Sequence, residues 1–222
     1  MALVETDNLS KHFDLGGGQT LHAVDGVSLT IEENEILGLV GESGSGKSTF
    51  GKTLIGLHPR SGGGARYAGN PLPAQFAPAD HLRYSREMQM IFQDPYSSLN
   101  PRMTVLDIVG EGLALRGGLS RAEIRDTVAG WLSRVGLHPD HMSRYPHEFS
   151  GGQRQRIGIA RAMIISPRFV VCDEPISALD VSVQAQVVNL LDELKESLGL
   201  TLLFIAHDLS MVRYVSSRMA VM

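Results

Sequence analysis

The run from Gly41 to Thr49 restricts the fold of this chain more than any other stretch. It reads Gly41-Glu42-Ser43-Gly44-Ser45-Gly46-Lys47-Ser48-Thr49 and fits the pattern G-x-x-x-x-G-K-S/T. The short apolar run from Ile36 to Val40 precedes it and is typical of a buried strand. The segment from Thr49 to Leu57 is expected to form a helix whose apolar face consists of Phe50, Leu54 and Leu57. A strand, a glycine loop and a helix are the context in which this pattern binds phosphate.

The residue types in this loop predict how a polyphosphate would be held. Backbone N–H groups can wrap a phosphate only where the chain turns tightly, and glycine permits such turns. The loop opens into a helix N-terminus, whose free N–H groups and positive dipole end favour an anion. Lys47 can reach the β- and γ-phosphates, and the Ser48 hydroxyl can ligate Mg²⁺. The sequence therefore predicts a nucleotide-binding site.

Length, charge and cysteine content limit the remaining possibilities. The 222 residues suffice for one α/β core, alone or with a subdomain. The net charge of −4 argues against a nucleic-acid partner, which would require a basic surface. The single cysteine, Cys172, excludes an internal disulfide and is typical of a reducing cytosol; its apolar neighbours predict a buried thiol.

No apolar run approaches the roughly 18 residues that cross a bilayer, so any membrane role is expected to depend on a partner. The first residues also lack the basic and apolar segments of a signal peptide. The last residues, from Arg218 to Met222, read as a strand without a following turn, so we expect the C-terminal end to be truncated.

The hydrophobic patterns predict strands in both halves of the chain and helices in the middle. Strands are expected over 2–9, 21–31, 36–40, 88–92, 169–173 and 202–206, with a turn at 16–18 and a loop or hairpin over 59–78. Helices are expected within 104–143, where Ser120 to Glu123 form a capping box, and from Ser150 to about Ile165. Asp180 is expected to N-cap a further helix that Gly199 closes.

Polar residues follow three of these strands, where ligands bind in open α/β sheets: Gln93, the pair Asp173 and Glu174, and His207. The acidic pair could merely solvate the strand end, and His207 could be a core histidine. Beside a phosphate loop, however, Mg²⁺ on Ser48 needs hard oxygen donors, which makes Asp173 the metal-side carboxylate. Glu174 is the next residue, so its side chain points in the direction opposite to that of Asp173 and is placed to polarise an attacking water.

Phe13 lies just before the glycine turn at 16–18. It is either a core or edge aromatic or a stacking platform for a nucleotide base, and its spacing does not separate these alternatives.

Taken together, these motifs resemble the nucleotide-binding domain of an ABC transporter. The resemblance covers about residues 9–222 and includes the phosphate loop, Gln93, the signature from Phe149 to Gln153, the acidic strand end at Glu174, the segment from Ser177 to Asp180, and His207. The segments 90–102 and 145–156 are similar to the oligopeptide, dipeptide and nickel importer branch, which includes glutathione importers. Phe149 replaces the usual leucine and Ile176 stands where many members have threonine.

The resemblance implies a fold and a division of the chain. The fold would be a P-loop NTPase core of the α/β class, with a mixed sheet, an N-terminal antiparallel β subdomain and an inserted helical subdomain. Residues 1–222 would form one ABC ATPase domain. Residues 1–93 and 167–222 would form the core, and residues 94–166 the helical subdomain.

The resemblance also implies roles for particular residues. Phe13 would stack on adenine, and Gln93 would ligate Mg²⁺. Lys47, Glu174 and His207 would be catalytic. Asp180 would belong to the D-loop, which is the segment from Ser177 to Asp180. The signature residues Ser150, Gly151, Gly152 and Gln153 would cap the γ-phosphate of an ATP that a second chain holds.

The implied function is the ATP-hydrolysing subunit of an importer for di- or oligopeptides or a related small solute. Its partners would be a second ABC ATPase domain, transmembrane permease subunits and, indirectly, a solute-binding protein. It would lie at the cytoplasmic face of the inner membrane. The rival hypothesis is an ABC ATPase of a soluble complex, acting in phosphonate breakdown or on DNA. DNA-associated members carry coiled-coil or zinc insertions and basic surfaces, which this chain lacks.

Overall fold

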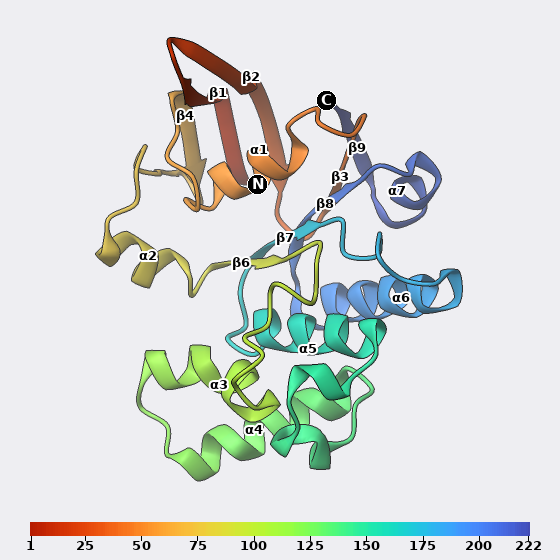
Figure 1. Ribbon diagram of the computed structural model, residues 1–222. Coiled ribbons are helices and arrows are strands. Elements are labelled where there is room, and N and C mark those ends of the chain that lie inside the picture. Colours follow the sequence, from red (N-terminus) through yellow and green to blue (C-terminus); the bar gives the residue numbers. More distant parts are fainter.

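The computed structural model describes residues 1–222 and contains two sheets flanked by helices (Figure 1). The first sheet is antiparallel, with the strand order β2-β1-β4-β5. Its strands are β1 (Ala2–Gly16), β2 (Gln19–Glu32), β4 (Gly62–Tyr67) and β5 (Asn70–Pro71). The hairpin of β1 and β2 is longer than the predicted 2–9 and 21–31, and several register shifts interrupt its pairing. These bulges break the period-two pattern, which explains why the sequence signal ended early.

The second sheet is parallel, with the strand order β6-β7-β8-β3-β9. Its strands are β6 (Met88–Ile91), β7 (Phe169–Asp173), β8 (Thr201–Ala206), β3 (Ile36–Val40) and β9 (Arg218–Val221). Alternate residues of β3 enter different cores: Leu37 and Leu39 belong to one apolar cluster, Ile36 and Val40 to the other. Both faces of the parallel sheet are therefore covered, as its near-continuous apolar strands predict.

The helices lie on both sides of this sheet. They are α1 (Lys47–Leu54), α2 (Pro78–Tyr84), α3 (Val105–Arg116), α4 (Arg121–Arg134), α5 (Gly151–Met163), α6 (Val181–Leu198) and α7 (Leu209–Val215). Two short 3-10 segments, Pro139–Ser143 and Pro146–Glu148, link α4 to α5. In Figure 1, α3 and α4 lie at the end of the molecule opposite the antiparallel sheet. They share one cluster of 34 buried residues with α5, α6 and one face of the parallel sheet.

The helix boundaries agree with the expected caps at three places. The Ser120 hydroxyl accepts a hydrogen bond from the Glu123 N–H (3.3 Å), and the Glu123 carboxylate accepts one from the Ser120 N–H (2.7 Å). Ser150 and Gln153 form the same reciprocal pair at the start of α5. Gly199 ends α6 in the left-handed conformation, as predicted.

One local prediction was correct in position only, and another was wrong. Asp180 occupies the N-cap position of α6, but its side chain makes no capping hydrogen bond there. The first helix ends at Leu54, because Gly56 with φ 81° turns the chain away, so Leu57 lies outside the helix and is 47% exposed.

None of the helices combines the length and the apolar character that a membrane crossing demands.

Candidate functional site

The glycine loop connects the end of β3 to the start of α1, at the carboxyl edge of the parallel sheet (Figure 1). Gly44 and Gly46 have φ angles of 83° and 97°, in the region that favours glycine. Gly46 also has no room for a side chain, because a Cβ there would lie 2.0 Å from the carbonyl oxygen of Ala23 on β2. The antiparallel sheet thus supports one wall of the loop, a contact that the sequence did not reveal.

Lys47 points into the loop and is only 4% exposed. Its ammonium donates hydrogen bonds to the carbonyl oxygens of Gly41 (2.8 Å) and Glu42 (2.7 Å) and to the hydroxyl of Ser45 (3.3 Å). All three acceptors are neutral, and no carboxylate forms an ion pair with this lysine. A buried cation with only neutral partners attracts an anion strongly.

Ser48 and Asp173 form the polar centre of the site. The Ser48 hydroxyl donates a 2.6 Å hydrogen bond to Asp173 Oδ1, joining residues 125 positions apart in the sequence. Asp173 is 1% exposed, and burial raises the pKa of its carboxyl, although Ser48 and the Lys52 ammonium, 3.9 Å away, oppose the shift. A hydroxyl beside a buried, incompletely neutralised carboxylate is a donor set that suits Mg²⁺. Lys52 was not singled out in the sequence, although its spacing of four from Ser48 places both on one face of α1.

We expect Asp173→Asn to stabilise the nucleotide-free protein near neutral pH. Because the pKa of Asp173 is raised, the folded chain binds this proton more tightly than the unfolded chain does. The ionised carboxylate therefore lowers the free energy of unfolding at high pH. This loss of stability disappears as the pH falls below the pKa of the carboxyl in the unfolded chain, about 3.9. The asparagine oxygen can still accept the hydrogen bond from Ser48.

The expected rise in Tm near neutral pH is a few degrees, since about 1 kcal/mol corresponds to roughly 2–4 °C in a chain of this size. Thermal denaturation in the presence of a chelator, at several pH values, checks this expectation. The difference between variant and parent should shrink toward acid pH, and a difference that grows there would contradict the assignment.

Glu174 connects the other strand-end residues. Its carboxylate accepts a 2.8 Å hydrogen bond from the Gln93 side chain and lies 3.7 Å from Nδ1 of His207. The structure thus brings together the three polar strand ends that the sequence singled out. Gln93 contacts Glu174 here rather than Asp173 or Ser48, so its role as a metal ligand stays a prediction.

The backbone at Glu174 is in the left-handed region, with φ 43°. A residue with a Cβ loses roughly 1–2 kcal/mol in this conformation. Such strain is concentrated at functional sites, where the surrounding structure holds it. Here the Glu174 N–H donates a hydrogen bond to the Ile205 carbonyl on β8, which fixes the turn.

The signature residues open α5 away from the glycine loop. Within the chain, no hydrogen bond links residues 150–153 to residues 41–49. Gly152 packs against the start of α6, and a Cβ there would lie 2.5 Å from Val183 Cγ1. The two departures from the family pattern, Phe149 and Ile176, are both buried in the larger apolar cluster, which explains why apolar residues are accepted there.

Phe13 lies on β1 with its ring partly exposed. The ring of His58 meets it edge-on at 5.5 Å, and the Lys11 ammonium lies 4.6 Å from its centre. Burial, Lys11 and Lys52 lower the pKa of His58. The stacking of Phe13 on adenine stays a prediction. Cys172 is fully buried, as predicted, and burial raises the pKa of its thiol to about 12.

The glycine loop lies between a buried parallel strand and a helix, and its Ser48 hydroxyl donates a hydrogen bond to Asp173 at the end of β7. These features together define a P-loop nucleotide-binding protein. The comparison with protein families is more specific. The protein-family model described as "ABC transporter" matches residues 24–177, and the chain belongs to that family.

Curated relatives match almost the entire chain. The oligopeptide transport ATP-binding protein OppF of Bacillus subtilis is 54% identical, over 99% of this chain and 72% of its own length. OppF of Salmonella typhimurium is 52% identical, over 99% and 68%. The dipeptide transport ATP-binding protein DppF of Lactococcus lactis is 52% identical, over 99% and 71%.

Solved structures agree with the fold. The ATP-binding cassette MJ0796, a dimer bound to ADP and Pi after hydrolysis, superposes with a TM-score of 0.89 at 28% identity, over 99% of this chain and 94% of that chain. The cbiO1 protein of Clostridium perfringens, part of the ABC transporter complex cbiONQ, gives 0.84 at 26% identity, over 100% and 84%. The predicted fold class and family are therefore confirmed.

Proposed function

We propose that this chain is the ATP-binding and ATP-hydrolysing subunit of an ABC importer that takes up di- or oligopeptides. The observation that carries the proposal is the pair of contacts at the carboxyl edge of the parallel sheet. Asp173 accepts a hydrogen bond from Ser48, and Glu174 lies beside His207. The names of the oligopeptide and dipeptide transport relatives support the choice of cargo class. They give no support to a soluble complex for phosphonate breakdown or a DNA-associated ATPase.

ATP would enter the loop with its phosphates against the N–H groups at the start of α1. The Lys47 ammonium would exchange its neutral acceptors for phosphate oxygens, a charge-assisted contact that is stronger than those it leaves. Phe13 would stack on the adenine from the antiparallel sheet. Ser48 and Asp173, with Gln93 as a further oxygen ligand, would hold the Mg²⁺ that neutralises phosphate charge when bound.

Glu174 would act on the attacking water. Its side chain is only 16% exposed, and the Gln93 amide fixes one carboxylate oxygen, so the other oxygen can accept a hydrogen bond from a water in line with the γ-phosphate. His207 would donate a hydrogen bond to the charge that develops on the γ-phosphate.

Ser150, Gly151, Gly152 and Gln153 would complete the site of a second chain. Ser150 at the N-terminus of α5 offers an anion site that no phosphate loop of the same chain meets. Two chains packed head to tail would enclose two ATP molecules between a loop and a signature, and Asp180 would lie in this interface. The dimeric cassette with ADP and Pi supports this arrangement. Hydrolysis would remove the bridging γ-phosphate and allow the chains to separate.

The motion would be passed to transmembrane permease subunits by the helical subdomain, residues 94–166, while residues 1–93 and 167–222 hold the nucleotide. The subunit would lie on the cytoplasmic face of the inner membrane, and a solute-binding protein would deliver the peptide.

Co-purification from membranes tests this function. The Glu174→Gln variant, expressed in cells and extracted with mild detergent and Mg-ATP, is expected to carry along subunits with membrane-spanning helices. The unaltered complex in vesicles should hydrolyse ATP faster when a peptide-loaded binding protein is added. Recovery with a soluble enzyme complex, and no response to peptide, would contradict the importer assignment.

A further inference from the structure

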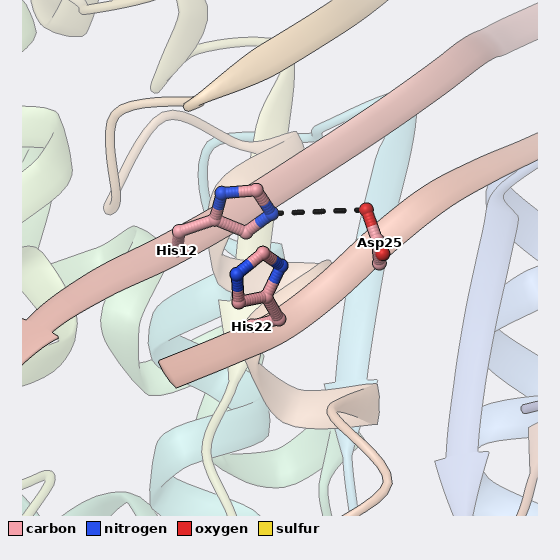
Figure 2. Close-up of side chains that lie close together, drawn as sticks. All are labelled: His12, His22 and Asp25. Atoms are coloured by element: carbon pink, nitrogen blue, oxygen red, sulfur yellow. Dashed lines mark ion pairs between the residues drawn. The ribbon is translucent and has the colours of Figure 1, made fainter. Parts of the chain in front are cut away.

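Three metal-ligating side chains meet on the β1–β2 hairpin, outside the site described above. His12 on β1 and His22 on β2 are directly opposite each other in the antiparallel register, and Asp25 follows three residues after His22 (Figure 2). Figure 2 shows all three side chains pointing toward one another from the two strands. None of them has a part in the proposed ATP chemistry.

The distances within this cluster are close to those around a bound ion. One ligand atom from each residue lies within 4.8 Å of the other two, and His12 Nε2 is 3.7 Å from Asp25 Oδ1. Two ligands at about 2.0–2.1 Å from one tetrahedral ion are about 3.3 Å apart, so small side-chain rotations would complete the set. Asp25 is 73% exposed and can make such a rotation freely.

His12 supplies a further observation about one of these ligand atoms, although its side chain as a whole is 29% exposed. Its Nε2 atom is buried and has no hydrogen-bond partner. A buried polar atom normally has a partner, and its absence calls for an explanation. The contact with Asp25 does not satisfy it, because 3.7 Å exceeds the length of a charge-assisted hydrogen bond, about 2.7–2.9 Å. The neighbouring His22 ring, 4.0 Å away between centroids, likewise makes no hydrogen bond to it.

We propose that His12, His22 and Asp25 bind a divalent transition-metal ion of the Zn²⁺ class. Two imidazoles and one carboxylate suit Zn²⁺, Ni²⁺ or Cu²⁺ and do not suit Mg²⁺, which prefers oxygen ligands. Three protein ligands leave the fourth position of a tetrahedral ion to water. The ion would link β1 to β2 across the hairpin. Ala23, between His22 and Asp25, is the residue whose carbonyl abuts Gly46.

Calorimetric titration of the untagged, nucleotide-free chain with Zn²⁺ tests the site. Excess Mg²⁺ is included to occupy oxygen-rich sites such as Asp173. One equivalent of Zn²⁺ is expected to bind. His12→Ala and His22→Ala should each weaken the binding by at least tenfold, and Asp25→Asn by less. The His22 side chain is exposed, so its removal should leave the fold intact, which the Tm in a chelator verifies.

His138→Ala is the matched control. His138 is an exposed histidine that lies 3.4 Å from Asp140, without a third ligand close enough to share an ion. This variant should bind Zn²⁺ like the parent chain. As a second measurement, Co²⁺ should give the visible absorption of a tetrahedral site in the parent and in His138→Ala, and not in His22→Ala. Zn²⁺ binding that persists without both His12 and His22, or that falls equally in His138→Ala, would overturn the proposal.

Discussion

Glu174→Gln is expected to slow ATP hydrolysis by about 10²- to 10⁴-fold, the usual contribution of a general base. The amide has the size of the carboxylate and can still accept the hydrogen bond from Gln93, but it cannot take a proton from water. Glutamine also keeps the left-handed backbone under the same restraint as glutamate. ATP affinity should therefore remain, and the variant should accumulate as an ATP-bound dimer.

Single-turnover hydrolysis and light scattering in Mg-ATP measure these two effects separately. Glu196→Gln is the matched control, because Glu196 is an exposed glutamate on α6 whose only ion pair is with Lys195. The control should hydrolyse ATP at the parent rate and stay monomeric under turnover. Normal hydrolysis in Glu174→Gln would assign the base to another residue.

Lys47→Ala is expected to reduce ATP affinity by roughly 10- to 150-fold. A hydrogen bond to a charged group contributes about 1.5–3 kcal/mol, and a factor of ten corresponds to about 1.4 kcal/mol. The substitution also removes the donor that holds the carbonyl oxygens of Gly41 and Glu42, so the loop loses part of the shape that suits phosphate.

Equilibrium binding of ATP, measured by calorimetry, checks this loss. Lys195→Ala removes a lysine from α6, outside the proposed site, and should bind ATP normally. If Lys47→Ala bound ATP as tightly as the parent chain, the phosphate-loop assignment would be wrong. Lys47→Ala and Glu174→Gln should also differ in assembly: Lys47→Ala should fail to form the ATP-dependent dimer, whereas Glu174→Gln should accumulate as that dimer.

The parallel sheet was largely predictable because its strands are short, apolar and buried on both faces. Ile36–Val40 and Phe169–Asp173 have the predicted bounds. The hairpin at the N-terminus was less predictable, because its bulges shift the alternation and the residues around its turn, 14–22, are exposed. The pairing of His12 with His22 depends on that shifted register, so the sequence did not reveal the cluster.

The centre of the candidate site was predictable for a topological reason. Ser48 and Asp173 are distant in sequence, but parallel strands bring their carboxyl ends to one edge. What the sequence did not show are the supporting contacts: Lys52 near Asp173 and the Ala23 carbonyl against Gly46. Both depend on how neighbouring elements pack, which local patterns do not encode.

The left-handed backbone at Glu174 has a consequence for evolution and engineering. Glycine would adopt this conformation without strain, so Glu174→Gly would relieve the local backbone strain while removing the carboxylate that we propose as the general base. A screen that rewarded thermal tolerance alone would enrich inert proteins at this position. Thermostable versions of this motor must therefore be sought under simultaneous selection for uptake.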